Sequence, residues 1–233
     1  VDLIDINYET YNIDIDKLKI KLDELKKKRK KIHTLIATDY AGQPSDWPKL
    51  RDLSRKYKFK LINDNCHAIG AKISNDQKYA VKYADLVCHS YHPVKNITTG
   101  EGGAVWSRDI DSAEFIDKIK SQGIKKGTRY EHDELGYNYR MTNIQAAIGC
   151  AQLAKIDEIL KRKRQLQDLY RATLEKYGAI FQQLPKSSSS SYWIIGALFP
   201  STDVNDLSDY LKQKNIDTRP FFSPVSSFKH VEY

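Results

Sequence analysis

The sequence predicts an α/β fold, with a mixed sheet flanked by helices on both faces and a smaller α+β domain after it. Short apolar runs alternate with amphipathic helical stretches over residues 1–120, a pattern typical of strand–helix units around a mainly parallel sheet. A long helical pattern over residues 142–177 leads to a second, shorter set of elements. We therefore expect part of a large domain over residues 1–150, and a linking helix with part of a small domain over residues 151–233.

The chain opens on two local signals. Residues 1–6 have the apolar character of a strand. Asp16 can cap a helix that continues to about Lys30, and its apolar positions at helical spacing are Leu18, Leu22 and Leu25. This first strand and helix begin the alternation.

The rest of the large domain continues the same alternation. Ser45 is expected to cap a helix with Trp47 and Pro48 in its first turn, and another helix is expected over residues 111–120. The expected strands cover residues 33–38, 59–63, 84–91 and 104–107.

The C-terminal part begins with the long helix over residues 142–177, whose recurring apolar stripe suggests a link between two domains. The serine run 187–191 has low complexity and indicates a flexible loop. A strand over residues 192–199 and a helix near residues 203–214 then predict a small α+β domain.

The composition indicates a globular protein with a mildly basic surface. Of the 233 residues 40% are hydrophobic, and the formal net charge is +8. No apolar run approaches the roughly 18 residues of a membrane span, so we expect no membrane association. The basic runs 26–31 and 161–164 lie on predicted helices without interleaved aromatic residues, which favours solvated helix faces over a nucleic-acid site. Such a surface also suits an anionic substrate.

Three cysteines are present, Cys66, Cys88 and Cys150, and no pair has C-x-x-C spacing. An odd number without such spacing is typical of reduced thiols in a cytoplasmic protein and does not indicate a metal site.

A lysine follows the apolar run 84–91. Lys95 stands at the exit of this predicted strand, before a loop rich in threonine and glycine over residues 98–103. Only a neutral amine attacks a carbonyl to form an imine, and a desolvated amine loses its proton more easily than a solvated one. Lys95 is therefore a candidate Schiff-base lysine. The alternative is an ordinary surface lysine of a loop.

A carboxylate and an imidazole follow the strand at residues 59–63. Asp64 and His67 are expected at its C-terminal end, the edge of an open α/β sheet where ligands bind. A carboxylate that keeps a pyridine nitrogen protonated makes pyridoxal phosphate an electron sink, and Asp64 fits that role. The alternative is that Asp64 starts a turn and His67 is a hydrogen-bonded interior residue.

Taken together, three segments resemble the DegT/DnrJ/EryC1/StrS family of nucleotide-sugar aminotransferases. The segments are residues 64–71, 90–103 and 134–141. The resemblance spans most of the chain and implies a pyridoxal-phosphate (PLP)-dependent transferase of fold type I.

The resemblance also implies a role for each matching position. Lys95 matches the lysine that binds the cofactor covalently, Asp64 the partner of the pyridine nitrogen, and His67 a position near the ring and its 3-hydroxyl. Ser90 matches a hydroxyl donor to the cofactor phosphate. Asn138 matches an asparagine that reaches the phosphate from the neighbouring subunit, so a homodimer with shared active sites is expected.

Arg219 belongs to a segment, residues 219–222, that resembles one near the active-site mouth of the family. It is a candidate substrate-binding residue; the alternative is a surface arginine that pairs with a carboxylate.

Within the family, the sequence around Lys95 most resembles enzymes of the pseudaminic acid pathway. This implies transfer of an amino group from glutamate to C4 of a UDP-linked 4-keto-6-deoxy-N-acetylhexosamine in bacterial surface-sugar biosynthesis. Lysine at this position, where some family members have histidine, favours transamination over dehydration. The alternatives are another 3- or 4-keto nucleotide-sugar aminotransferase, a different transferase of the same fold type, and a non-catalytic fragment.

Family members carry a segment before the first residues of this chain, with a phosphate-binding loop and an aromatic residue that stacks on the cofactor. Neither is visible here, and the only methionine is Met141. We therefore expect this sequence to be the interior of a longer protein.

Overall fold

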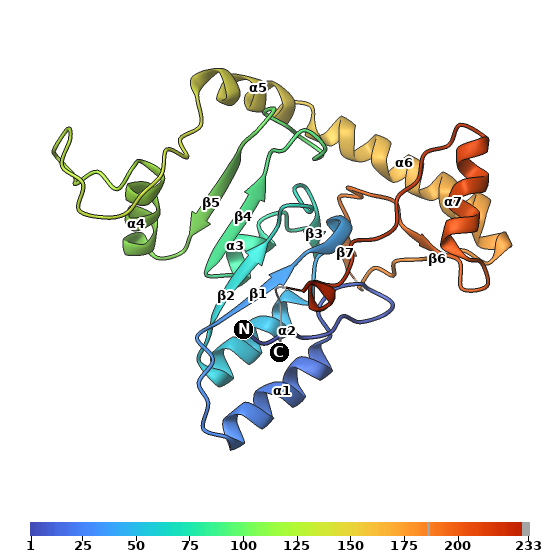
Figure 1. Cartoon of the computed structure of the whole chain (residues 1–233), viewed down its shortest axis with the longest axis horizontal. Coiled ribbons are helices and arrows are strands. Elements are labelled where there is room, and N and C mark those ends of the chain that lie inside the picture. The colour runs from blue at the N-terminus through green and yellow to red at the C-terminus, as the bar shows by residue number, and fades with distance from the viewer. Residues whose placement is uncertain (186, 230–233) are drawn as a thin grey trace.

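A mixed four-stranded sheet forms the centre of the computed structural model, which describes residues 1–185 and 187–229 (Figure 1). The strand order is β1-β2-β4-β5, where β1, β2 and β4 are parallel and β5 runs antiparallel to β4. These strands are β1 (Thr34–Thr38), β2 (Lys60–Asp64), β4 (Leu86–Ser90) and β5 (Gly103–Ser107). The prediction of a mixed sheet is confirmed.

One face of the sheet is covered by helices (Figure 1). The covering helices are α1 (Ile15–Lys27), α2 (Trp47–Tyr57) and α3 (Tyr79–Tyr83). They bury one apolar core with alternate residues of the strands, so the burial of this side of the sheet is the main driving force for the fold. Its largest fully buried members include Trp47, Tyr79, Leu18, Leu22, Leu50 and Leu61.

The opposite face of the sheet carries a different set of side chains. The register aligns Thr38 with Asp64 and Asp64 with Cys88, so these three residues lie side by side on it. Ile36 and Val105 on this face are 64% and 49% exposed. Helices were predicted on both faces, but the described residues cover this second face only in part.

The C-terminal half contains α4 (Ile110–Lys120), α5 (Asn143–Leu153), α6 (Ile156–Leu174) and α7 (Val204–Gln213). The single long helix predicted over residues 142–177 is two helices, because the chain turns between Leu153 and Ile156. Short strand pairs complete this half: β3 (Lys72–Ile73) with β7 (Ser188–Ser189), and β6 (Ile180–Phe181) with β8 (Ala197–Leu198). Three single-turn 3-10 helices are η1 (Tyr40–Gly42), η2 (Glu175–Tyr177) and η3 (Val225–Ser227).

Two predicted helix caps are wrong by one or two residues. Asp14 caps α1 in place of Asp16, and its carboxylate accepts two backbone N–H groups of the first turn. Asp46 caps α2 in place of Ser45, whose hydroxyl is directed to the Thr38 carbonyl instead.

Two predicted segments have a different structure. Residues 1–6 form no strand and make a single bridge, from Ile6 to Ile13. The serine run, predicted as a flexible loop, pairs with β3 and then buries Ser191 completely. Tertiary hydrogen bonds order this run, which its composition alone does not predict.

Asp39, directly after β1, is the polar centre of the core. It is fully buried, and its carboxylate accepts hydrogen bonds at 2.7 to 3.2 Å. Burial raises its pKa to about 6, and these bonds oppose the rise, so the group is charged at pH 7. The donors are the Ser45 N–H and the side chains of Trp47, Asn63, Asn65 and Tyr79. One carboxylate thus joins the starts of α2 and α3 to the C-terminal ends of β1 and β2.

Across residues 1–185 and 187–229, every helix is too short or too polar to cross a membrane. The same residues contain no group of histidine, cysteine and acidic side chains that could hold a metal ion, and all three cysteines are free.

Replacing Asp39 with alanine should lower the free energy of unfolding by about 3–5 kcal/mol, because several buried donors lose their acceptor. Urea denaturation followed by tryptophan fluorescence measures the loss. Asp46→Ala is the control, since it removes only the cap of α2 and should cost about 1 kcal/mol. A loss at Asp39 no larger than at Asp46 would contradict the central role of this carboxylate.

Candidate active site

The candidate site begins at the C-terminal end of β2. Asp64 is the last residue of this strand and points to the opposite face from its neighbour Asn63, which is bonded to Asp39. The Asp64 carboxylate accepts hydrogen bonds from the Thr38 hydroxyl at 3.4 Å and the Cys66 N–H at 3.1 Å. Both contacts orient the carboxylate. The contact with Thr38 comes from the neighbouring strand β1, whereas the contact with Cys66 comes from the turn that follows Asp64.

Ser90 lies at the same edge, as the last residue of the adjacent strand β4. Its side-chain oxygen accepts the His92 N–H at 3.3 Å, so the hydroxyl proton remains available for another acceptor. Ser90 and Asp64 thus come from neighbouring parallel strands.

The loop after β4 positions Lys95. A turn joins the Lys95 N–H to the His92 carbonyl at 3.0 Å, and Thr98 and Thr99 close the loop onto the carbonyl of Tyr91. The amine is partly buried. Burial lowers the pKa of Lys95, while the thiol of Cys66 and the carboxylate of Asp64 act in the opposite direction.

His67 lies in the turn after β2 and faces the same space. Its Nδ1 atom accepts the Ala41 N–H at 3.4 Å. Burial, followed by the nearby charge of Lys95, lowers the pKa of His67 to about 4, with Asp64 opposing the shift. His67 is therefore neutral at pH 7, and the structure brings Asp64, His67 and Lys95 within electrostatic range of one another.

A third wall of the site comes from the Ser190–Trp193 segment, which the sequence analysis assigned to a loop and a strand of the small domain. Trp193 is 8% exposed, and its indole stacks on His67 with 3.8 Å between ring centroids. Ser191 donates its N–H to the Gly42 carbonyl and its hydroxyl to the His67 carbonyl. Gly42 has φ +98°, and a Cβ there would collide with Ser191, so only glycine permits this close approach.

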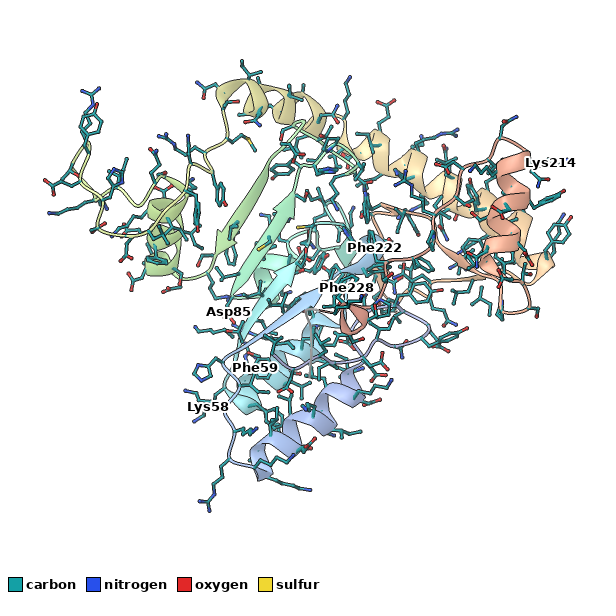
Figure 2. The ribbon with its side chains drawn as sticks, viewed as in Figure 1. Lys58, Phe59, Asp85, Lys214, Phe222 and Phe228 are labelled. Carbon is teal, nitrogen blue, oxygen red and sulfur yellow. The ribbon has the colours of Figure 1, made fainter. Side chains whose placement is uncertain are left out.

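Other aromatic rings enclose the same space. The centroid of the Phe222 ring lies 6.1 Å from the ring centroid of Tyr40, 6.3 Å from that of His67 and 6.4 Å from that of Trp193. Figure 2 shows Phe222 near the middle of the molecule, whereas Lys214, just after α7, lies at the periphery. The segment after α7 therefore returns to the candidate site.

Two predicted site residues lie elsewhere in the chain. Asn138 is exposed in the connection between α4 and α5, which extends beyond β5 and away from the other strands (Figure 1). Its side-chain oxygen accepts a hydrogen bond from Arg140 at 3.1 Å. Arg219 is exposed between α7 and η3. Among the contacts found in the described part of the chain, neither residue meets Asp64, His67 or Lys95.

Comparison with known proteins identifies the family. Residues 1–232 match the sequence profile of the DegT/DnrJ/EryC1/StrS aminotransferase family. The chain belongs to this family. The match extends over nearly the whole chain and thus includes the three segments in which the resemblance was first seen.

Curated relatives of this DegT/DnrJ/EryC1/StrS member carry more than one name. GDP-perosamine synthase of Vibrio cholerae is 35% identical over 228 residues, with 95% of this chain and 61% of the relative covered. UDP-4-amino-4,6-dideoxy-N-acetyl-beta-L-altrosamine transaminase of Campylobacter jejuni is 36% identical over 239 residues, with 98% of this chain and 61% of the relative covered. The chain thus spans about 61% of the length of these relatives.

Solved structures agree with the fold. An aminotransferase of Helicobacter pylori involved in the biosynthesis of pseudoaminic acid superposes with a TM-score of 0.84 at 26% identity, over 99% of this chain and 62% of its own. A putative sugar aminotransferase of Streptococcus pneumoniae, solved in a PLP form, gives 0.83 at 21% identity over 98% of this chain and 63% of its own. The predicted fold type I architecture is confirmed.

The residues present fit the PLP that the family implies. A carboxylate, a neutral imidazole and an amine of lowered pKa lie within electrostatic range of one another, and Ser90 offers a hydroxyl at the same sheet edge. The imidazole of His67 stacks on the indole of Trp193, so its face is one against which a flat ring packs. The chemistry of these groups suits a planar pyridine that carries an aldehyde and a phosphate.

The depressed pKa of His67 gives the protein a defined pH dependence. Because the folded state binds the proton less tightly than the unfolded state between pH 4 and 6.5, the free energy of unfolding should rise with pH through this window. The rise attributable to His67 should be on the order of 1–2 kcal/mol after allowance for solvent screening.

Urea denaturation from pH 4 to 7 measures the effect as the difference between wild type and His67→Gln. His33→Gln, at an exposed position, is the matched control. If the free energy of unfolding of His67→Gln rose with pH as steeply as that of the wild type, His67 would not titrate as the structure indicates.

Proposed function

We propose that the protein is a PLP-dependent nucleotide-sugar aminotransferase. The observation that carries this proposal is the partly buried amine of Lys95, held beside Asp64 and His67 at the C-terminal edge of the sheet. Family membership supports it, since the matching profile is that of an aminotransferase family.

In this proposal Lys95 is the catalytic amine. Burial lowers its pKa, which increases the fraction of neutral amine available to attack the cofactor aldehyde. The same Nζ atom, once free, can accept a proton and return it at a neighbouring carbon, because one basic group held in place can serve both directions of transfer.

Three other residues bind and orient the cofactor. Asp64 would keep the pyridine nitrogen protonated, His67 would lie near the ring and its 3-hydroxyl, and the Ser90 hydroxyl would donate to the phosphate. PLP supplies an electron sink that stabilises negative charge on the carbon bearing the amino group. The buried position of His67 keeps its imidazole neutral, so it can orient the ring without adding positive charge.

The proposed substrate is a UDP-linked 4-keto-6-deoxy-N-acetylhexosamine, aminated at C4 with glutamate as donor, as in pseudaminic acid biosynthesis. The Campylobacter jejuni relative, at 36% identity, supports it. A GDP-linked 4-keto sugar is the second candidate, because the Vibrio cholerae relative is 35% identical. Arg219 is proposed to contact the substrate at the mouth of the site.

A homodimer with shared active sites completes the proposal. The exposed loop that carries Asn138 is available to a neighbouring subunit, where Asn138 would reach the cofactor phosphate. We further propose a cytoplasmic location, and a domain boundary near residues 150–151, close to the break between α5 and α6.

Incubation with PLP, borohydride reduction and peptide mapping tests the assignment of Lys95. The wild type should bind the cofactor covalently at Lys95, and both Lys95→Ala and Lys95→Arg should lose this attachment, since neither side chain forms an imine. Lys163→Arg is a control for another partly buried lysine. Trapping spread over surface lysines in the wild type would overturn the assignment.

Asp64→Asn should retain covalent attachment at Lys95 but slow amino transfer from glutamate by about 10²-fold or more, because a neutral amide cannot keep the pyridine nitrogen protonated. Single-turnover absorbance changes measure this half-reaction. A rate close to that of the wild type would exclude Asp64 as the ring partner. The second half-reaction, run with UDP-, GDP- and dTDP-linked 4-keto sugars, separates the candidate substrates.

A further inference from the structure

Trp193 contacts both Lys95 and the residue before it, Val94. The Lys95 Nζ atom lies over the indole, 3.9 Å from the ring centroid. The indole Nε1–H donates to the carbonyl of Val94 at 2.7 Å, one residue before Lys95. One side chain therefore contacts both the backbone of the lysine loop and the amine at the end of the lysine side chain.

Trp193 is itself held in place by three other elements. Its N–H donates to the Ala41 carbonyl in η1 at 3.1 Å, and its own carbonyl accepts from Lys163 of α6 at 3.0 Å. The imidazole of His67 stacks on the ring. Because backbone and ring are both fixed and the residue is 8% exposed, the indole provides a rigid surface for the amine.

The face of an indole attracts a cation, so this contact favours the protonated amine. The other groups that act on the charge of Lys95 are Asp64 at the end of β2 and Cys66 in the turn after it. The neighbouring His67 is neutral, and Lys163 binds the Trp193 carbonyl rather than the ring. Burial opposes the charge, and the indole and Asp64 favour it.

We propose that Trp193 is a positioning residue that holds the Lys95 amine at the site and sets how readily this amine loses its proton. The use of that amine in cofactor binding rests on the proposed function. The contact itself belongs to this chain alone and can be measured without cofactor.

The variants Trp193→Phe and Trp193→Leu separate the aromatic face from simple packing. Both lose the bond to Val94 and both keep an apolar side chain, but only phenylalanine retains a π face. Trace acetylation with acetic anhydride across pH 7–11, followed by peptide mapping, gives the neutral fraction of Lys95 relative to exposed Lys27 in the same sample.

Below the pKa of Lys95, the leucine variant should be about five-fold more reactive at Lys95 than the phenylalanine variant, as expected from loss of a cation–π contact. Equal reactivity of Lys95 in the two variants would overturn the proposal. If Trp193 had only a structural role, the two substitutions would change the reactivity of Lys95 by the same amount.

Fluorescence provides a second measurement, which requires no substitution at position 193. Tryptophan emission of the wild type should show an alkaline titration step at the pH where acetylation shows Lys95 losing its proton. Lys95→Met should abolish this step, and Trp106→Phe should retain it. A titration step that persists in Lys95→Met would contradict the proposal. If the wild type shows the step but PLP is not trapped at Lys95, the result would count against the proposed function alone.

Discussion

The buried carboxylate of Asp39 is the interaction on which the site depends. An ionised group in an apolar core is tolerated only when its lone pairs are satisfied. Here they accept from β2 and the turn after it, from the Ser45 N–H, and from the first residues of α2 and α3. Those donors include Asn63 and Asn65, the residues on either side of Asp64. The position of the candidate cofactor-binding carboxylate is thus set from the core side of the sheet.

The alternation of side chains along β2 separates stability from chemistry. Asn63 points into the core and anchors the strand, while Asp64 points to the less covered face and keeps its carboxylate accessible. The same division holds in β4, where Val87 is buried and Ser90 lies at the site edge. Each strand therefore contributes one candidate functional residue at its C-terminal end.

The sequence was sufficient for the parts of the fold that local patterns encode. Apolar periodicity predicted α1 and the four main strands, and the geometry of parallel strands predicted that Asp64 and Lys95 would share one edge. Trp193 could not be found in this way, because its contact with Lys95 joins distant parts of the chain and has no local signature. The ordered serine run was missed for the same reason, and the roles of Asn138 and Arg219 stay predictions.

Hydrogen bonds join the Ser190–Trp193 segment to residues far earlier in the sequence. The separations are 149 residues to Gly42, 124 to His67 and 99 to Val94. Contacts of such long range carry a large entropic cost of loop closure, so we expect them to form after the local contacts of the sheet. During synthesis the strands that carry Asp64 and Lys95 emerge well before the indole. The lysine loop therefore passes through a period in which its amine is open to water and to any free aldehyde, and this period ends only when the C-terminal part of the chain has docked.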